Sequence, residues 1–393
     1  MLYQDYVNRA KELGQQVLSS VEHGFQGNYM RCWQAAKAAG LKFVYGAEAY
    51  WVPDRHQPDR SNRHIVLLAK TKKGMYQLNR ALSCASEDGY YVVPRVDMEL
   101  LRQLDPKDVM VTTACVAYWG KVDRETNLLL PFEDHELLLE DMALHFGNSL
   151  FLEVQAHHTP WQKEVNQRCI HHARSLGVPL IAGLDSHYIY PDQRLERQFL
   201  REESGIKFAE GDHELDASVF EDYPDEETAH LRFTQQGVLT ESEIADAIKM
   251  TDIILDFEDI DFDTSRKFPT IYPDLTQEER NQLYLKHIDD AWQKYKQNVD
   301  PALWPVYEAG IKEETNVITS TNTSDYFLMD EAIFKLGREK YGGIVTPTGR
   351  GSNGSYFTNT LLGLSTLDRF ALPVTLYPSR FVTAERLRTG IPD

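Results

Sequence analysis

Short apolar runs that alternate with helical segments limit what the first half of this chain can fold into. Residues 42–46, 64–69 and 178–183 are apolar runs with the length of buried strands. Residues 29–39 have helical spacing instead, and they are followed by Gly40, as the last turn of a helix often is. Strands that alternate with helices predict an α/β fold with a mostly parallel sheet.

Polar side chains follow most of these strand-like runs directly. In parallel sheets the active groups gather at the carboxyl ends of the strands, so we expect such side chains to lie together. His64 differs from the others because it opens its run. The candidates that follow strand ends are His23, Glu48, Cys115, the adjacent pair His157 and His158, Asp185 and His187. Neighbouring side chains of a strand point in opposite directions, so at most one histidine of the adjacent pair would face a site.

Imidazole, carboxylate and thiol groups at one edge of a sheet predict a divalent metal site. The His and Cys content favours zinc, and a metal cluster of this kind would activate water for phosphoester hydrolysis. The tightest element of the set is Asp185-x-His187. The alternative interpretation is that these side chains are hydrogen-bonded polar groups at the starts of loops.

A glycine-rich turn with hydroxyl groups and an arginine marks the last part of the chain. Residues 348–355 are Thr-Gly-Arg-Gly-Ser-Asn-Gly-Ser, and helical sequence follows over residues 356–362. Backbone N–H groups of such a turn can contact an anion, and a helix N-terminus would add positive potential. The turn therefore predicts phosphate binding, with an ordinary glycine loop as the alternative.

Charge is distributed unevenly along the chain. The net charge is −19, and as an average it would argue against nucleic-acid binding, which Lys and Arg carry. Residues 201–263, however, hold 20 acidic and four basic residues, whereas residues 331–390 hold eight basic and four acidic ones. We expect the acidic segment to form a solvated face and the basic part to surround the phosphate-binding turn.

The same composition excludes several classes of protein. No apolar run approaches the roughly 18 residues of a membrane span, and the N-terminus lacks the basic and apolar pattern of a signal peptide. The four cysteines have no C-x-x-C spacing, which is typical of a reducing compartment. We therefore expect a cytoplasmic protein without a membrane partner.

Taken in their order along the chain, the motifs strongly resemble the N-terminal part of the bacterial DNA polymerase III α subunit, a C-family replicative polymerase. The first motifs resemble its PHP (polymerase and histidinol phosphatase) domain, and the later ones the beginning of its palm domain. The matching residues are Glu22-His23-Gly24, residues 40–48, residues 64–69 with Gly74, Pro94-Arg95, Ala114-Cys115, residues 184–188, residues 325–328, residues 349–355, residues 362–364, Arg380-Phe381, Glu385-Arg386 and Pro392-Asp393.

The resemblance implies an α/β fold in three parts. Residues 1–235 would form a PHP-like distorted βα barrel, residues 236–320 a helical connector that leads into the palm, and residues 321–393 a palm segment with the glycine-serine phosphate motif. The PHP domain of the family opens with a His-x-His motif, and this chain is expected to start beyond it.

The resemblance also implies roles for single residues. The PHP metal, Zn²⁺ or Mn²⁺, would be bound by His23, Glu48, His64, Cys115, Asp185 and His187. Without the opening motif each metal would lack partners, which favours a structural role for this site. The dNTP phosphates would be contacted by Arg350, Gly351, Ser352, Ser355 and Arg380. Asp393 matches the first of the catalytic carboxylates, which in the family bind Mg²⁺ together with residues that follow.

Three hypotheses result. The first is the N-terminal portion of a DNA-directed DNA polymerase for replication, which transfers nucleotides from dNTPs by a two-metal mechanism. Its partners would be primer-template DNA, a C-terminal polymerase fragment that completes the site, and a sliding clamp.

The second hypothesis is a PHP-type metal-dependent phosphoesterase or 3′–5′ exonuclease, and the third is a non-catalytic interaction module of a polymerase. Because both ends cut through active-site motifs, we expect the product of a split polymerase gene, of the kind found in a phage.

Overall fold

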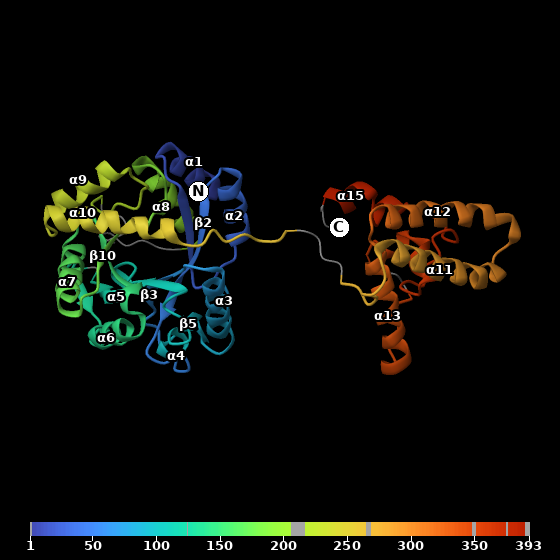
Figure 1. Ribbon diagram of the computed structural model, residues 1–393, viewed down its shortest axis with the longest axis horizontal. Coiled ribbons are helices and arrows are strands. Elements are labelled where there is room, and N and C mark those ends of the chain that lie inside the picture. The colour runs from blue at the N-terminus through green and yellow to red at the C-terminus, as the bar shows by residue number, and fades with distance from the viewer. Residues whose placement is uncertain are drawn as a thin grey trace. The chain divides into compact units, whose positions relative to one another are not determined.

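The computed structural model describes residues 2–123, 125–205, 217–264, 269–347, 351–374 and 376–389 (Figure 1). The chain divides into two compact units, Met1–Phe262 (unit 1) and Asp263–Asp393 (unit 2). The sequence places domain boundaries after residues 235 and 320, and these boundaries stay predictions. Residue 235 lies inside α9 (Glu226–Gln236), which belongs to unit 1.

Unit 1 is built on an eight-stranded sheet with the order β10-β9-β6-β3-β2-β5-β4, in which β1 pairs with β2. β1, β2 and β5 run parallel, as do β6, β9 and β10, whereas β3 is antiparallel to both β2 and β6. The strands are β1 (Val17–His23), β2 (Lys42–Trp51), β3 (Arg63–Ala69), β4 (Tyr90–Tyr91), β5 (Val93–Val96), β6 (Val109–Thr112), β9 (Leu150–Gln155) and β10 (Leu180–Gly183). The predicted α/β fold with a mostly parallel sheet is confirmed, with β3 and the short β4 reversed.

Alternate side chains of the strands pack on opposite faces of this sheet, as the strand period of two requires. On the outer face, Phe43 and Leu67 belong to the main core beneath the helices. On the inner face, Val44 and Leu68 form a smaller cluster with Phe257, which follows η4 (Thr251–Asp256). Residues at the inner positions of neighbouring strands therefore share one surface.

Helices cover the outer face of the sheet (Figure 1). α7 shows how the sequence sets their ends, because Thr159 accepts a hydrogen bond from the N–H of Gln162, Pro160 occupies the first turn, and Gly177 ends the helix at φ +70°. The helices of unit 1 are α1 (Tyr3–Glu12), α2 (Tyr29–Ala38), α3 (Lys72–Glu87), α4 (Met98–Leu101), α5 (Val116–Trp119), α6 (His135–Phe146), α7 (Pro160–Leu176), α8 (Arg194–Glu203), α9 (Glu226–Gln236) and α10 (Glu241–Met250), and a hairpin joins β7 (Gly120–Val122) to β8 (Leu129–Pro131).

The acidic segment lies at the surface of unit 1 in most of its described part. Two of its carboxylates are buried, with exposed fractions of 9% for Glu221 and 4% for Asp222. Glu221 pairs with Arg197 at 2.9 Å, and Asp222 pairs with Arg232 at 2.7 Å. The expected solvated face therefore holds two buried ion pairs that join segments of unit 1.

Unit 2 is helical in every regular element of its described residues. Its main core contains Tyr284, Ile318, Phe327 and Tyr356. The elements are α11 (Gln277–Tyr295), α12 (Trp304–Ser320), α13 (Ser324–Tyr341), η7 (Asn353–Ser355), α14 (Phe357–Leu361), η8 (Pro378–Arg380) and α15 (Ala384–Thr389), with short 3-10 turns between α11 and α12. Within the described ranges of the whole chain, none of the helices has the length and apolar character that a membrane span needs.

Candidate metal centre

The reversed direction of β3 explains why His64, which opens a strand, lies with residues that end strands. In the register of the sheet, His23 at the end of β1 pairs with Glu48 of β2, and His64 pairs with Tyr50. Because β3 runs antiparallel to β2, its first residues lie beside the last residues of β2. The topology thus brings together side chains from three strands at one edge of the inner face.

Glu48 lies between two imidazoles at this edge. Its Oε2 is 3.1 Å from His23 Nε2, and its Oε1 is 2.9 Å from His64 Nδ1. Glu48 is buried, and the ligand atoms of the three residues all lie within 4.8 Å of one another. Two imidazoles and one carboxylate form a donor set that suits zinc and related cations. These residues therefore fit a divalent metal.

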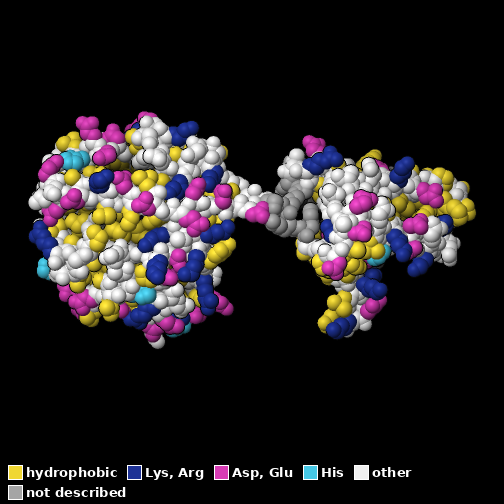
Figure 2. All heavy atoms as spheres, viewed as in Figure 1, with side chains coloured by type: hydrophobic (Ala, Val, Ile, Leu, Met, Phe, Trp, Pro, Cys, Tyr) yellow, Lys and Arg dark blue, Asp and Glu magenta, His cyan; other side chains and the backbone are white. Residues whose placement is uncertain are grey.

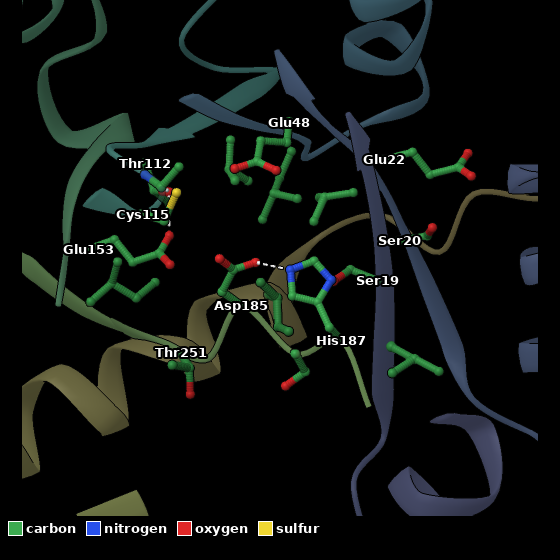
Figure 3. A pocket seen from close by; sticks show the side chains of 18 of the residues that line it. Ser19, Ser20, Glu22, Glu48, Thr112, Cys115, Glu153, Asp185, His187 and Thr251 are labelled. Carbon is green, nitrogen blue, oxygen red and sulfur yellow. Dashed lines mark hydrogen bonds and ion pairs between the residues drawn. The ribbon is translucent and has the colours of Figure 1, made fainter. Parts of the chain in front are cut away.

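The other predicted ligands line the same region (Figure 3). Cys115 Sγ is 3.4 Å from His64 Nδ1, and Asp185 Oδ1 is 3.3 Å from His187 Nε2. A cavity of about 660 Å³ is lined by His23, Glu48, Cys115, Asp185 and His187, among others. A second cavity of about 560 Å³ is lined by His64 together with four of these five residues. The structure thus places all six residues in one region, and their role as ligands stays a prediction.

Two non-glycine residues of this region have a left-handed backbone. Ala114 has φ +47° and Asp185 has φ +49°. Such conformations are uncommon in residues other than glycine, more so in alanine than in aspartate, and they cluster at functional sites. The N–H of Ala114 donates a hydrogen bond to Thr112 Oγ1 at 3.1 Å, which holds the turn that presents Cys115. The backbone outliers support a functional interpretation of the cluster.

Burial and neighbouring charges control protonation in this cluster. Burial raises the pKa of the Cys115 thiol well above its usual value, so binding of a metal to sulfur would have to release a proton. Burial likewise lowers the pKa of His23. Burial also disfavours the charged form of Asp185, but the hydrogen bond from His187 and the charges of nearby imidazoles outweigh it and lower the pKa of Asp185. The site therefore combines the ionised carboxylate of Asp185 with a neutral thiol at Cys115 and a neutral imidazole at His23.

Glu153 is a residue of the cavity that sequence reasoning did not select. It lies on β9 at an inner position, where Oε2 accepts a hydrogen bond from Thr112 at 2.6 Å and Oε1 accepts one from Gln155 at 3.1 Å. Burial raises its pKa to about 7. The only signal in the sequence is a single acidic residue inside an apolar strand, and the strand period does not say by itself which face of the sheet that residue occupies.

The adjacent histidines after β9 point in different directions, as expected for neighbours in an extended segment. His157 lines the second cavity, and its Nδ1 accepts a hydrogen bond from the N–H of Phe220 at 3.0 Å. His158 donates from Nε2 to the carbonyl oxygen of Arg232 at 2.8 Å. Burial lowers the pKa of His157 to about 4, so this imidazole is neutral.

The glycine-serine turn of unit 2 combines exposed and buried residues. Gly351 is exposed and has φ +72°, a conformation that favours glycine, and Ser352 is partly exposed. Ser355 is buried, and its N–H donates to the carbonyl oxygen of Ser352 at 2.9 Å. Arg380 is exposed at the end of η8, which contacts η7 of the turn. Two further predicted residues, Arg350 and Asp393, lie outside the described residues.

The helix after this turn is capped from within unit 2. The N–H groups of Phe357 and Thr358, at the start of α14, donate to the carboxylate of Glu314 at 3.0 and 2.8 Å. Arg369 Nε donates to the same carboxylate at 2.8 Å. Glu314 is completely buried. The N–H groups at this helix N-terminus are therefore bound to Glu314 and do not contribute to phosphate binding as expected. Phosphate binding would depend on the glycine-serine turn and on Arg380.

Comparison with known families matches both units. The PHP domain family matches residues 2–157, and the family described as the bacterial DNA polymerase III alpha NTPase domain matches residues 284–393. A solved structure of a putative metal-dependent phosphoesterase from Bifidobacterium adolescentis is 14% identical, covers 47% of this chain and 82% of its own, and has a TM-score of 0.32. The family match and the sheet support the PHP-like fold that the motifs predicted for unit 1.

Curated relatives extend the match over nearly the whole chain. The DNA polymerase III subunit alpha of Aquifex aeolicus is 26% identical over 99% of this chain and 34% of its own length. The subunits of Borreliella burgdorferi (32% identical, 47% of this chain, 16% of the relative) and Chlamydia trachomatis (24%, 99% and 35%) agree. The chain is thus similar to bacterial DNA polymerase III α subunits over nearly its whole length, which confirms the resemblance that its motifs predicted. It spans about a third of the length of the relatives that match it throughout.

Proposed function

We propose that this chain forms the N-terminal portion of a DNA-directed DNA polymerase that acts in replication. The observation that carries the proposal is the similarity to DNA polymerase III α subunits over 99% of the chain, in one order and through both units. The reaction is nucleotidyl transfer from dNTPs to a primer on a DNA template. It requires the remaining portion that the longer relatives contain.

In this proposal unit 2 binds the triphosphate of the incoming nucleotide. Gly351 and Ser352 offer backbone N–H and hydroxyl groups to the phosphates, and Arg380 from the contacting η8 adds a positive charge. Mg²⁺ bound by Asp393 and by carboxylates of the remaining portion would neutralise charge that develops on the phosphates. Glu314 and Arg369 hold the start of α14 behind the turn and so position it.

Primer extension tests the polymerase proposal. The chain alone, the remaining two thirds of the Aquifex aeolicus relative alone, and both together are assayed on the same primer-template with Mg²⁺. We expect extension only by the mixture, and a KM for dNTP that rises about tenfold or more in Arg380→Ala, since a charge-assisted phosphate contact is lost. Arg102→Ala, an exposed arginine of unit 1, is the matched control. A mixture without activity would contradict the proposal, and a chain that binds the second portion without supporting extension would indicate an interaction module.

A second candidate function is metal-dependent phosphoester hydrolysis at the PHP site, including 3′–5′ exonuclease activity. The grouping of His23, Glu48 and His64 within 4.8 Å beside a cavity favours it. A Zn²⁺ or Mn²⁺ ion bound there would supply an activated water for attack on phosphorus. Asp185 and His187 would orient the substrate or complete the ligand set.

Metal analysis and hydrolysis of a phosphodiester test this second function. We expect His187→Ala to lower the rate by at least about a hundredfold, while His56→Ala, which changes an exposed histidine outside the cavities, leaves it unchanged. Equal activity in the two variants would exclude this site as the source of the hydrolysis.

A further inference from the structure

A second group of metal-ligating side chains lies in the helical layer of unit 1, away from the inner face of the sheet. His135 and Glu136 are the first two residues of α6, and His172 lies near the end of α7. Both helices contribute to the main core on the outer face, for example through Leu139 and Val165. The group therefore belongs to a different layer from Glu48 and its partners.

The three side chains are spaced for one ion. One ligand atom from each of His135, Glu136 and His172 lies within 4.8 Å of the other two. The two imidazoles are buried, at 5% and 8% exposed, whereas Glu136 is exposed. An ion at this position would therefore contact buried nitrogen on one side and an open, carboxylate-bearing surface on the other.

The histidines are held in a form that can bind a metal. His135 Nδ1 is 2.5 Å from the carbonyl oxygen of Phe132, and because a carbonyl only accepts, Nδ1 carries the proton and Nε2 presents its lone pair. Metal-bound histidines commonly donate their other N–H to a carbonyl in this way. The ring of His172 stacks on Trp119 at 5.7 Å and 22°. Neither ring needs to be ordered by the metal.

Arg168 donates a hydrogen bond to the lone pair of His135 Nε2, which a metal would use instead. Its Nη1 lies 3.4 Å from His135 Nε2, while Nε and Nη2 are held by Glu164 at 3.1 and 2.7 Å. A metal would therefore displace one guanidinium N–H, and the two bonds to Glu164 would retain the arginine. The positive charge of Arg168 would also weaken binding of a cation.

We propose that His135, Glu136 and His172 bind a divalent transition metal of the zinc class, with water at the remaining position, independently of the site around Glu48. Two imidazoles favour such a cation over Mg²⁺ or Ca²⁺, which prefer oxygen ligands. The metal joins the start of α6 to α7. It adds a structural link between two helices that already meet through the core, through the ring of Trp119 and through the contact of Arg168 with His135.

Titration with Zn²⁺ alone, in competition with a chromophoric chelator, tests the site in the full chain. The background variant His23→Ala/His64→Ala removes the first cluster, and we expect one Zn²⁺ per chain to remain bound. On this background, His172→Gln should lower the affinity at least a hundredfold and Glu136→Gln about tenfold. Arg168→Gln should raise the affinity for Zn²⁺ several-fold, because it removes a positive charge beside the ion. If the three side chains only packed together and bound no metal, this change would not affect Zn²⁺ binding.

His171→Gln is the matched control, because His171 is an exposed neighbour whose ring is 5.2 Å from that of His172. We expect no change in affinity for this variant. A background variant that binds no Zn²⁺ overturns the proposal, as does an equal loss in His171→Gln and His172→Gln, which would indicate an exposed histidine pair. If circular dichroism shows that His172→Gln does not fold, Glu136→Gln and Arg168→Gln decide, since both change the more accessible side of the cluster.

Discussion

Each unit of this protein contains a buried glutamate, and the two differ in what surrounds the carboxylate. In unit 1, Glu48 contacts the imidazoles of His23 and His64. In unit 2, Glu314 accepts hydrogen bonds from two backbone N–H groups of α14, from a threonine hydroxyl, and from Arg369. The imidazoles beside Glu48 can bind a metal through their ring nitrogens. The N–H groups and the guanidinium beside Glu314 can only donate hydrogen bonds to its carboxylate.

This difference separates a candidate metal site from a structural contact. A buried carboxylate with a permanent cation and backbone donors is satisfied, so its removal affects stability. A buried carboxylate between two imidazoles retains the capacity to bind a cation, because the ring nitrogens are themselves ligands. Both glutamates are buried, so burial does not distinguish a metal ligand from a structural carboxylate. The groups that contact each carboxylate do.

The largest effect is expected from Arg369→Leu in unit 2. The change leaves Glu314 buried without its cation, and breaking a buried pair in this way costs about 3–5 kcal/mol. Both side chains are largely buried, with exposed fractions of 7% and 0%. The loss is measured as the free energy of unfolding of unit 2 in urea.

Glu313→Gln is the control for this change, since Glu313 is the exposed neighbour on the same helix. If Arg369→Leu and Glu313→Gln have the same small effect, the carboxylate of Glu314 is not the structural contact described above. The distinction between the two glutamates would then fail.

A pH-dependent effect is expected from His157, whose Nδ1 must be unprotonated to accept the N–H of Phe220. The pKa of His157 is lowered by burial to about 4 in the folded state, from an ordinary value near 6.5. The unfolded chain therefore takes up a proton first, so this contribution is complete above pH 6.5 and is lost as the pH falls toward 4. It amounts to about 3 kcal/mol. His157→Asn, which keeps an acceptor without titrating, should remove this slope from the unfolding curves of unit 1.

Glu153 acts in the opposite direction and must be separated from His157. Burial raises its pKa to about 7, so the folded state holds a proton that the unfolded chain releases, and stability falls as the pH rises from about 4.5 to 7. Measurements on a Glu153→Gln background isolate the histidine. If wild-type and His157→Asn chains have the same pH dependence on this background, His157 is not held neutral by burial.

Glu48→Gln is expected to abolish metal binding at the first cluster with little effect on folding. The neutral amide keeps the shape and hydrogen-bonding capacity of the side chain but loses the negative ligand, and we expect at least about a hundredfold loss of Zn²⁺ affinity, or about 2.7 kcal/mol. Calorimetric titration of the chelator-treated chain measures it. Glu87→Gln, at an exposed position of α3, is the control. If Glu48→Gln lowered stability as much as Arg369→Leu does, Glu48 would have a structural role like that of Glu314.

The smallest effect is expected from Thr112→Val. This change tests Glu153, a third, partly buried glutamate, whose hydrogen-bond partners Thr112 and Gln155 are both neutral. Thr112 Oγ1 donates to Glu153 and accepts the N–H of Ala114. Loss of the hydroxyl should cost about 1–2 kcal/mol and raise the pKa of Glu153 further. A double-mutant cycle with Glu153→Gln gives the energy of this contact. A coupling energy near zero would show that the hydroxyl does not stabilise the carboxylate.

Much of the candidate site could be predicted because its residues follow strand ends. Cys115 and Asp185 were selected from their position after apolar runs, and the structure places them beside one cavity. Glu153 could not be selected, because one acidic residue within an apolar strand faces either side with equal justification until the sheet is known. The pair of Glu314 and Arg369 is separated by 55 residues, and no local pattern connects them.

The amino-acid sequence by itself determined the resemblance to DNA polymerase III α subunits, the α/β class and the positions of the polar motifs, because these depend on local periodicity and on residue order. It also identified the glycine-rich turn. Only the tertiary structure decided that His64 joins His23 and Glu48, since this depends on the direction of β3. Only the tertiary structure decided that the start of α14 is bound by Glu314. Both results depend on which distant segments pack together, and such contacts leave no periodic signal in the chain.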